Sequence, residues 1–307
     1  MAIRLPAGLL RTVLRILLKP FLGPPFSIGF QRFWVRLVSI ANPVSRAAST
    51  STLEVEGMFA VRARPKSSEP NRTVLYFHGG AYCIGSWQTY RGLITHLAVA
   101  ADAVVYSPNY RLAPEDPHPA ALEDGMLAYR WLLDQGIRPG QIALAGDSAG
   151  AGLALATAVA LRDSGLPLPA SIVLLSPGVD LSGDYPSMRQ NARKDPMIRP
   201  SWFHLCASLY LGGRPPDDPA CSPLFANHEG LPPMLIHVGT DEVLLDDSTR
   251  LAERCREAGV DVTLKVFEGM WHEFQIHAGL LKESDEAAAE IGEFLQSHFS
   301  DAARYPR

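Results

Sequence analysis

The 307-residue chain has few of the features that mark disulfide-rich, zinc-binding or membrane-spanning proteins. Its four cysteines, Cys83, Cys206, Cys221 and Cys255, include no closely spaced pair, which argues against a disulfide framework and a CxxC zinc site. No apolar run approaches the ~20 residues that span a bilayer. Basic residues interrupt the apolar N-terminus, which argues against a cleaved signal peptide. We therefore expect reduced thiols in a cytoplasmic protein.

Acidic residues are absent from the first 50 positions, although the whole chain carries a formal net charge of only −4. Those 50 residues hold seven Lys or Arg, which leaves 21 basic and 32 acidic residues, a charge of −11, in 51–307. The overall charge balance has no excess of basic residues of the kind that binds nucleic acid. With 47% hydrophobic and 20% charged residues, the composition also excludes a disordered chain. The sequence thus joins a basic arm to an acidic body that buries a sizeable core.

The basic arm predicts two short amphipathic helices. Over residues 9–19, Leu and Val side chains share one stripe while Arg11, Arg15 and Lys19 recur on another face, and Pro20 ends the pattern. Aromatic and aliphatic residues repeat the helical spacing over 30–38. We expect these helices to dock on the protein body; the alternative is contact with an anionic membrane surface.

From residue 53 onward, short apolar strands alternate with helical segments. We expect extended segments at 53–55 and 58–64, strands at 74–77, 103–106, 142–145, 172–175, 234–238 and 262–267, and helices near 119–135, 149–163, 243–258 and 284–299. This alternation predicts an α/β fold with a largely parallel sheet covered on both faces. The proline-rich interval 180–233 breaks it and is expected to be an insertion over the carboxyl ends of the strands, where such sheets hold ligands.

The strongest motif is Gly146-Asp147-Ser148-Ala149-Gly150, a GxSxG between a predicted strand and a predicted helix. Small neighbours let the chain turn sharply and present the Ser148 hydroxyl as a nucleophile. Its base is expected to be His272, on a loop after the 262–267 strand. His237 is expected to be packed within a strand. The histidines expected at the surface are His96, His118, His204, His228, His277 and His298.

The acid that orients the base is expected to be Asp241, directly after the 234–238 strand. The alternatives are Glu242, Asp246 and Asp247, of which the last two fall in or near the next helix, where capping is the commoner role. The order Ser148, Asp241, His272 is the Ser-acid-His order of GxSxG hydrolases. It differs from the orders in chymotrypsin-like and subtilisin-like proteases.

A glycine-rich segment, His78-Gly79-Gly80-Ala81, follows the 74–77 strand. We expect backbone N–H groups of Gly79, Gly80, Ala81 and Ala149 to stabilise the oxyanion that forms on a reacting carbonyl. A zinc site at His272 and His277 is rejected, because they are five residues apart, whereas two ligands on one helix face need a spacing of about four.

Together these motifs resemble those of the hormone-sensitive-lipase-like family of α/β-hydrolase carboxylesterases. The resemblance covers about residues 74–300. It rests on the segments 78–81, 85–86, 110–115, 119–121 and 146–150, together with Asp124, Asp241 and His272. It implies an α/β-hydrolase fold with an eight-stranded, mostly parallel sheet and helices on both faces. It also implies a helical cap, built from residues 1–50 and the 180–233 insertion, over a catalytic domain at 51–307.

The same resemblance implies hydrolysis of short- to medium-chain acyl esters through a Ser-His-Asp triad and an acyl-enzyme, without a metal or other cofactor. The chain departs from the family pattern at three positions. Ala81 stands where the oxyanion motif HGGG has its last glycine. The acid is often followed by Pro-Leu, where Glu242-Val243 follows Asp241. The base is often followed by Gly-Phe, where Glu273-Phe274 follows His272.

A triad fixes acyl transfer but not the acyl donor, so a deacetylase, an amidase and a lactone hydrolase are alternatives on the same residues. A non-catalytic small-molecule receptor is the alternative from another class. The ordered set of Ser148, Asp241 and His272 favours the enzyme. The expected partner is a small-molecule ester; a membrane-surface contact through the arm and a homodimer stay open.

Overall fold

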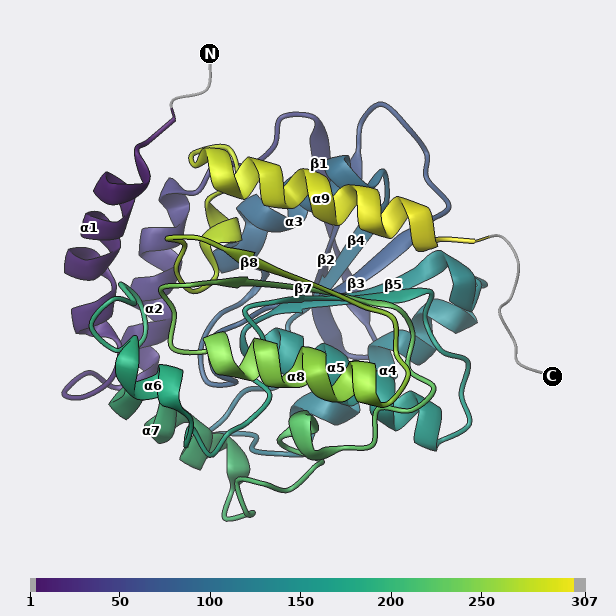
Figure 1. Cartoon of the computed structure of the whole chain (residues 1–307). Helices are drawn as coiled ribbons and strands as arrows, with labels where there is room; N and C mark the ends of the chain where they lie inside the picture. Colours follow the sequence, from purple (N-terminus) through teal and green to yellow (C-terminus); the bar gives the residue numbers. More distant parts are fainter. Residues whose placement is uncertain (1–3, 301–307) are drawn as a thin grey trace.

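The computed structural model describes residues 4–300, and an eight-stranded sheet lies at its centre (Figure 1). The strand order is β1-β2-β4-β3-β5-β6-β7-β8. Strand β2 is antiparallel to both β1 and β4, and the remaining neighbours are parallel. The strands are β1 Ala48–Val55, β2 Met58–Pro65, β3 Thr73–Phe77, β4 Val104–Pro108, β5 Ile142–Asp147, β6 Ser171–Leu175, β7 Met234–Gly239 and β8 Val262–Phe267. The predicted α/β-hydrolase fold class is confirmed.

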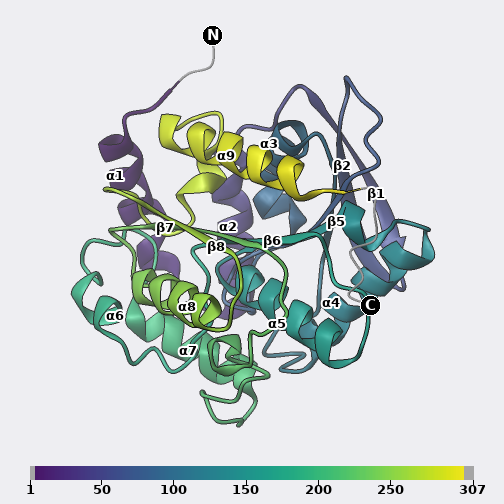
Figure 2. The ribbon, with the colours of Figure 1, turned by 45° about the vertical axis from the view of Figure 1, so that its right-hand side comes forward.

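Helices cover both faces of the sheet (Figures 1 and 2). Helices α3 and α9 lie on one face, and α4, α5 and α8 lie on the other. The helices are α1 Ala7–Leu17, α2 Ile28–Val38, α3 Trp87–Ala101, α4 Ala120–Asp134, α5 Ala149–Asp163, α6 Pro186–Gln190, α7 Pro200–Leu211, α8 Leu245–Glu257 and α9 Lys282–His298. The sequence prediction missed α3, whose buried face includes Thr89, Gly92 and Thr95. These residues interrupt the apolar stripe by which a helix is found in a sequence.

The central strands of the sheet support the site. Every residue of β3, β5, β6 and β7 is buried, as expected for parallel strands with helices on both faces. Strand β8 lies at the edge of the sheet and is half exposed. Because these strands are parallel, the loops after β3, β5, β7 and β8 all leave the sheet at the same edge.

The basic arm docks on the body at this edge. Helices α1 and α2 lie near α6 and α7 of the 180–233 insertion (Figures 1 and 2). Arg15 and Lys19 donate to backbone carbonyls of residues 192–195, and Arg11 pairs with Asp241 at 2.7 Å. Over residues 4–300, no helix has the length and apolar character needed to cross a membrane.

A buried glutamine joins the arm to the insertion. Gln31 on α2 is fully buried, and its Oε1 accepts a hydrogen bond of 2.8 Å from the indole Nε1 of Trp202 on α7. Its Nε2 donates to the carbonyl of Phe26 at 2.9 Å. The first contact satisfies two polar groups that would otherwise be buried without a partner, which costs folding free energy. The second contact is partly buried.

Replacing Gln31→Leu should therefore lower the free energy of unfolding by about 1–3 kcal/mol, because the Trp202 N–H and the Phe26 carbonyl lose their partner. Chemical denaturation measures the change. The matched control is Gln190→Leu on the exposed surface of α6, where we expect a change within about 0.5 kcal/mol. Equal effects of the two substitutions would contradict a bridging role for Gln31.

Candidate active site

Ser148 occupies a sharp turn between β5 and α5. Its φ of 51° and ψ of −121° lie in a region that L-residues rarely adopt, at a cost of about 1–3 kcal/mol. A Cβ at Gly146 would lie 2.3 Å from the Gly150 carbonyl oxygen, and one at Gly150 would lie 2.0 Å from the Phe77 carbonyl oxygen. Both glycines are therefore required for this turn, which gives Ser148 the geometry expected of a nucleophile elbow.

Two cavities meet at Ser148. The larger cavity has a volume of about 200 Å³ and is lined by apolar side chains of α1 and α2, among them Leu14 and Val35, and by His272. The smaller cavity has a volume of about 20 Å³. Its walls include Phe203 of α7, and Trp202 contributes to both cavities.

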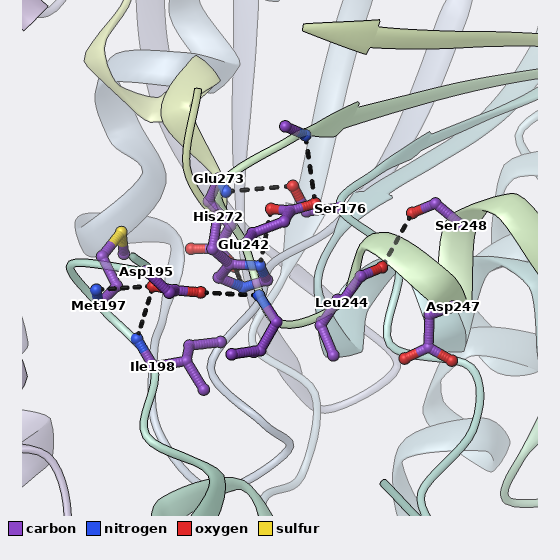
Figure 3. Close-up of polar contacts among 12 residues, drawn as sticks. Ser176, Asp195, Met197, Ile198, Glu242, Leu244, Asp247, Ser248, His272 and Glu273 are labelled. Carbon is purple, nitrogen blue, oxygen red and sulfur yellow. Dashed lines mark hydrogen bonds and ion pairs between the residues drawn. The ribbon is translucent and has the colours of Figure 1, made fainter. Parts of the chain in front are cut away.

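His272 lies on the loop after β8, between two buried carboxylates (Figure 3). Its Nδ1 is 3.3 Å from Oε2 of Glu242, and its Nε2 is 3.5 Å from Oε1 of Glu273. The two carboxylate side chains are only 0% and 6% exposed. Since His272 and Ser148 line the same cavity, the fold brings the predicted nucleophile and base together and places Glu242 at the other ring nitrogen.

Asp241, predicted as the acid, pairs with basic residues of the arm and of the insertion. Its carboxylate accepts a hydrogen bond from Arg11 at 2.7 Å and lies 4.0 Å from Nζ of Lys194. The structure therefore places the runner-up Glu242, and not Asp241, beside the imidazole. The two carboxylates are neighbours on one turn, and the arm attracts the first outward while the second is fully buried.

The sequence did contain a signal for Glu242. In the family pattern the acid is followed by Pro-Leu, and Leu244 stands two residues after Glu242 rather than two after Asp241. The other two alternatives bind the insertion instead. Asp247 accepts a hydrogen bond of 2.7 Å from the Tyr185 hydroxyl, and Asp246 accepts one of 2.7 Å from the Ser187 N–H.

Insertion residues brace the loop that carries Glu242 (Figure 3). Oδ2 of Asp195 accepts a hydrogen bond of 3.1 Å from the N–H of Val243. The side-chain amide of Asn191 donates to the carbonyls of Thr240 at 3.2 Å and Glu242 at 2.9 Å. These contacts join segments about 50 residues apart in the chain, so no local pattern could have indicated them.

The predicted oxyanion segment turns through left-handed conformations. Gly80, Ala81 and Tyr82 have φ values of 112°, 52° and 58°. Gly80 lines the larger cavity, while Ala81 and Ala149 line the smaller one. Three of the four predicted oxyanion residues thus stand at the cavities that meet at Ser148.

Gly79, the fourth predicted oxyanion residue, packs against two carboxyl groups. A Cβ at this position would lie 2.2 Å from Oδ2 of Asp147 and 2.3 Å from Oε1 of Glu273. Gly79 lines neither of the two cavities. Close packing therefore explains this glycine without a role in binding an oxyanion.

Negative charge dominates the electrostatics around His272. Burial alone would lower the pKa of the imidazole, but Glu273 and then Glu242 outweigh it and raise that pKa well above 6.5. Burial raises the pKa of Glu242 and of Asp195, although the nearby imidazole acts in the opposite direction on both. The site is thus built to stabilise a proton on His272.

The remaining histidines show that burial is a poor guide to a catalytic role. His118, His228 and His277, expected at the surface, are buried, as is His237, which was expected to be packed. Burial lowers the pKa of His237 to about 3 and that of His277 to about 4. These two rings are therefore neutral near pH 7.

Known proteins match the chain over most of its length. A family model for the alpha/beta hydrolase fold matches residues 74–276. A putative acetyl-hydrolase of Mycobacterium tuberculosis, LipR, is 34% identical over 300 residues, which cover 98% of this chain and 97% of the relative. An esterase of Acinetobacter venetianus is 39% identical over 240 residues, covering 77% and 79% of the two chains.

Solved structures match equally well. The crystal structure of an esterase from the bacterial hormone-sensitive lipase family superimposes with a TM-score of 0.91 at 41% identity, covering 95% of this chain and 98% of the other. A hormone-sensitive lipase from a metagenome library superimposes with a TM-score of 0.93 at 35% identity, covering 97% and 100%.

The strain at Ser148 predicts that Ser148→Gly stabilises the protein, since glycine adopts positive φ freely. We expect the free energy of unfolding to rise by roughly 1 kcal/mol, the strain relieved less the larger chain entropy of glycine. Urea denaturation measures it. Gly150→Ala should act in the reverse direction, because its methyl would meet the Phe77 carbonyl. A Ser148→Gly protein less stable than the wild type would contradict strain at this turn.

Proposed function

Since the chain belongs to the hormone-sensitive-lipase-like esterases of the alpha/beta hydrolase fold family and is a carboxylic ester hydrolase, we propose that Ser148, His272 and Glu242 form its catalytic triad. One observation carries the proposal. The imidazole of His272 has Glu242 at Nδ1 and shares a cavity with the strained Ser148. The order of these residues in the chain is the Ser-acid-His order of GxSxG hydrolases.

In the proposed reaction, Oγ of Ser148 attacks the ester carbonyl and its proton passes to Nε2 of His272. Glu242 holds the neutral ring with its hydrogen on Nδ1 and stabilises the imidazolium that forms. Backbone N–H groups of Gly80, Ala81 and Ala149 are the proposed donors to the oxyanion. The imidazolium then gives its proton to the leaving alcohol, and water repeats the sequence on the acyl-enzyme.

Two adjacent carboxylates offer a direct test of the triad. Glu242→Gln should lower kcat for a short p-nitrophenyl ester by about 10⁴, because an amide at Nδ1 no longer fixes the productive tautomer. Asp241→Asn, which removes the neighbouring carboxylate that binds Arg11, should leave kcat within about threefold, as expected for loss of a partly exposed ion pair. Ser148→Ala gives the background rate. The reverse ranking of the two variants would restore Asp241 as the acid.

We further propose that the acyl group lies in the smaller cavity and the alcohol in the larger one. The imidazolium must protonate the leaving alcohol, so the alcohol lies on the side of His272, which lines only the larger cavity. The smaller cavity, at about 20 Å³, holds little more than one water-sized group, since each requires about 10–15 Å³. Short acyl groups joined to longer apolar alcohols are therefore the proposed substrates.

Two isomeric esters of equal hydrophobicity can distinguish the enzyme's preference for the acyl group from its preference for the alcohol. We expect kcat/KM for hexyl acetate to exceed that for ethyl hexanoate by at least about tenfold, a difference of 1.4 kcal/mol in transition-state binding. Phe203→Ala enlarges the smaller cavity and should lower the ratio of kcat/KM for hexyl acetate to kcat/KM for ethyl hexanoate. Val35→Ala, in the larger cavity, should not lower this ratio. Equal or reversed rates in the wild type would overturn this partition. A wild-type protein that hydrolyses neither ester would instead count against the proposed triad.

A further inference from the structure

A buried pair of carboxyl groups lies beside the proposed triad and has no role in the mechanism above. Asp147 precedes the nucleophile and is fully buried, and Glu273 follows the base and is 5% exposed. An ideal Cβ on Gly79 would lie within 2.2 Å of an oxygen of Asp147 and 2.3 Å of an oxygen of Glu273. Two carboxyl groups from distant parts of the chain therefore meet under the loop that follows β3.

The pair can carry only one negative charge. A carboxylate has no hydrogen to donate, and two adjacent buried carboxylates cannot both be ionised. Oδ1 of Asp147 accepts a hydrogen bond from the Tyr76 hydroxyl, whereas Oδ2 has no donor among the residues that the structure describes. A proton on Oδ2 of Asp147, directed at Glu273, satisfies both groups.

The environment of each group decides which one holds the proton. Burial and then the charge of Glu273 raise the pKa of Asp147 well above its usual range. Burial also acts to raise the pKa of Glu273, but His272 and the hydrogen bonds from Asp147 and Tyr90 outweigh it and hold that pKa below its usual range. The Tyr90 hydroxyl donates to Oε2 of Glu273 at 3.2 Å. The charge therefore lies on Glu273.

The carboxylate of Glu273 lies near Nε2 of His272, but it does not take the place of the proton that Nε2 accepts from Ser148. Oε1 of Glu273 is 3.5 Å from Nε2, beyond the 2.7–3.2 Å of an N–H···O hydrogen bond. While the ring is neutral, with its hydrogen on Nδ1, Nε2 keeps a lone pair that can accept the Ser148 proton. Once the ring is protonated, the contact with Glu273 becomes an ion pair. Glu273 is held in this place by a left-handed backbone with φ 54° and by its N–H, which donates to Ser176 at 3.2 Å.

We propose that Glu273 is a positioning residue that acts as a second counter-ion to His272, and that Asp147 is a neutral acid that holds Glu273 in place. The proposal rests on the triad proposed above. When Ser148 transfers its proton to Nε2, the imidazolium is stabilised by Glu242 at one edge and by Glu273 at the other. No proton moves to Glu273, and the Asp147–Glu273 pair keeps its single proton throughout the cycle.

The groups that set the protonation of His272 come from four elements. Glu242 approaches from the loop after β7, Glu273 from the loop of His272 itself, and Asp195 from the insertion. Asp147 at the end of β5 acts through Glu273. Because every charged member is negative, the wild-type rate should fall as the pH drops through a His272 midpoint above 6.5, since only the neutral ring accepts the Ser148 proton.

The test is the acid limb of kcat/KM against pH for a short p-nitrophenyl ester. Glu273→Gln should move the midpoint to lower pH by about 1–3 units, the effect of one opposite charge within 4–6 Å. Asp147→Asn should leave the midpoint in place, because the amide copies a neutral acid that donates to Glu273. The matched control is Glu268→Gln, which removes an exposed charge from the same loop and should also leave the midpoint unchanged.

Two further measurements keep the result independent of folding and of the triad. Glu273→Gly suits the left-handed backbone, so a shift shared with Glu273→Gln reflects the lost charge rather than a strained loop. The NMR titration of His272, identified by its loss in His272→Gln, should show the same downward shift without any substrate. An unchanged midpoint in Glu273→Gln, or an equal shift in Asp147→Asn, would overturn the proposal. Wild-type turnover in Ser148→Ala would refute the triad instead.

Discussion

His272 lies between Glu242 and Glu273, each of which approaches a different ring nitrogen in the buried interior of the site. Burying a carboxylate is unfavourable unless a cation or hydrogen-bond donors compensate it. The imidazole supplies a positive charge when it is protonated, and the Ser176 and Tyr90 hydroxyls supply donors. Much of the surrounding structure follows from this need. Gly79 has no side chain because the carboxyl pair fills the space, and Glu273 accepts a left-handed backbone to reach the ring.

The N-terminal arm and the insertion hold this cluster in place from outside. Arg11 on α1 bonds to Asp241 and to the carbonyl of Gly269, so one side chain spans the loops that carry the proposed acid and base. Lys19 and Arg15 bond to carbonyls in the insertion segment that contains Asp195. The basic arm thus contributes its charge to docking and its apolar side chains to the larger cavity. The same two helices therefore dock on the insertion and line the larger cavity.

Local patterns in the sequence predicted the fold and the placing of Ser148 and His272 at one cavity. Ser148 and His272 could be found because each follows a strand of the parallel sheet, and the carboxyl ends of such strands converge on one edge. Position after a strand does not distinguish Asp241 from Glu242, which are neighbours on one turn; only the spacing to Leu244 favoured Glu242. The contacts that separate the two carboxylates are not local, because Asp241 pairs with Arg11, 230 residues away in the chain, whereas Glu242 is fully buried. The contact between Asp147, at the end of β5, and Glu273, on the loop after β8, likewise joins distant parts of the chain and has no local signature.

Trapping the nucleophile tests the central claim most directly. The wild-type protein would be incubated with diethyl p-nitrophenyl phosphate, digested and analysed by mass spectrometry. An active elbow predicts one diethylphosphoryl group, on Ser148, and its loss or strong slowing in Glu242→Gln but not in Asp241→Asn. No adduct, an adduct on another residue, or equal labelling of Glu242→Gln and the wild type would contradict a triad of Ser148, His272 and Glu242.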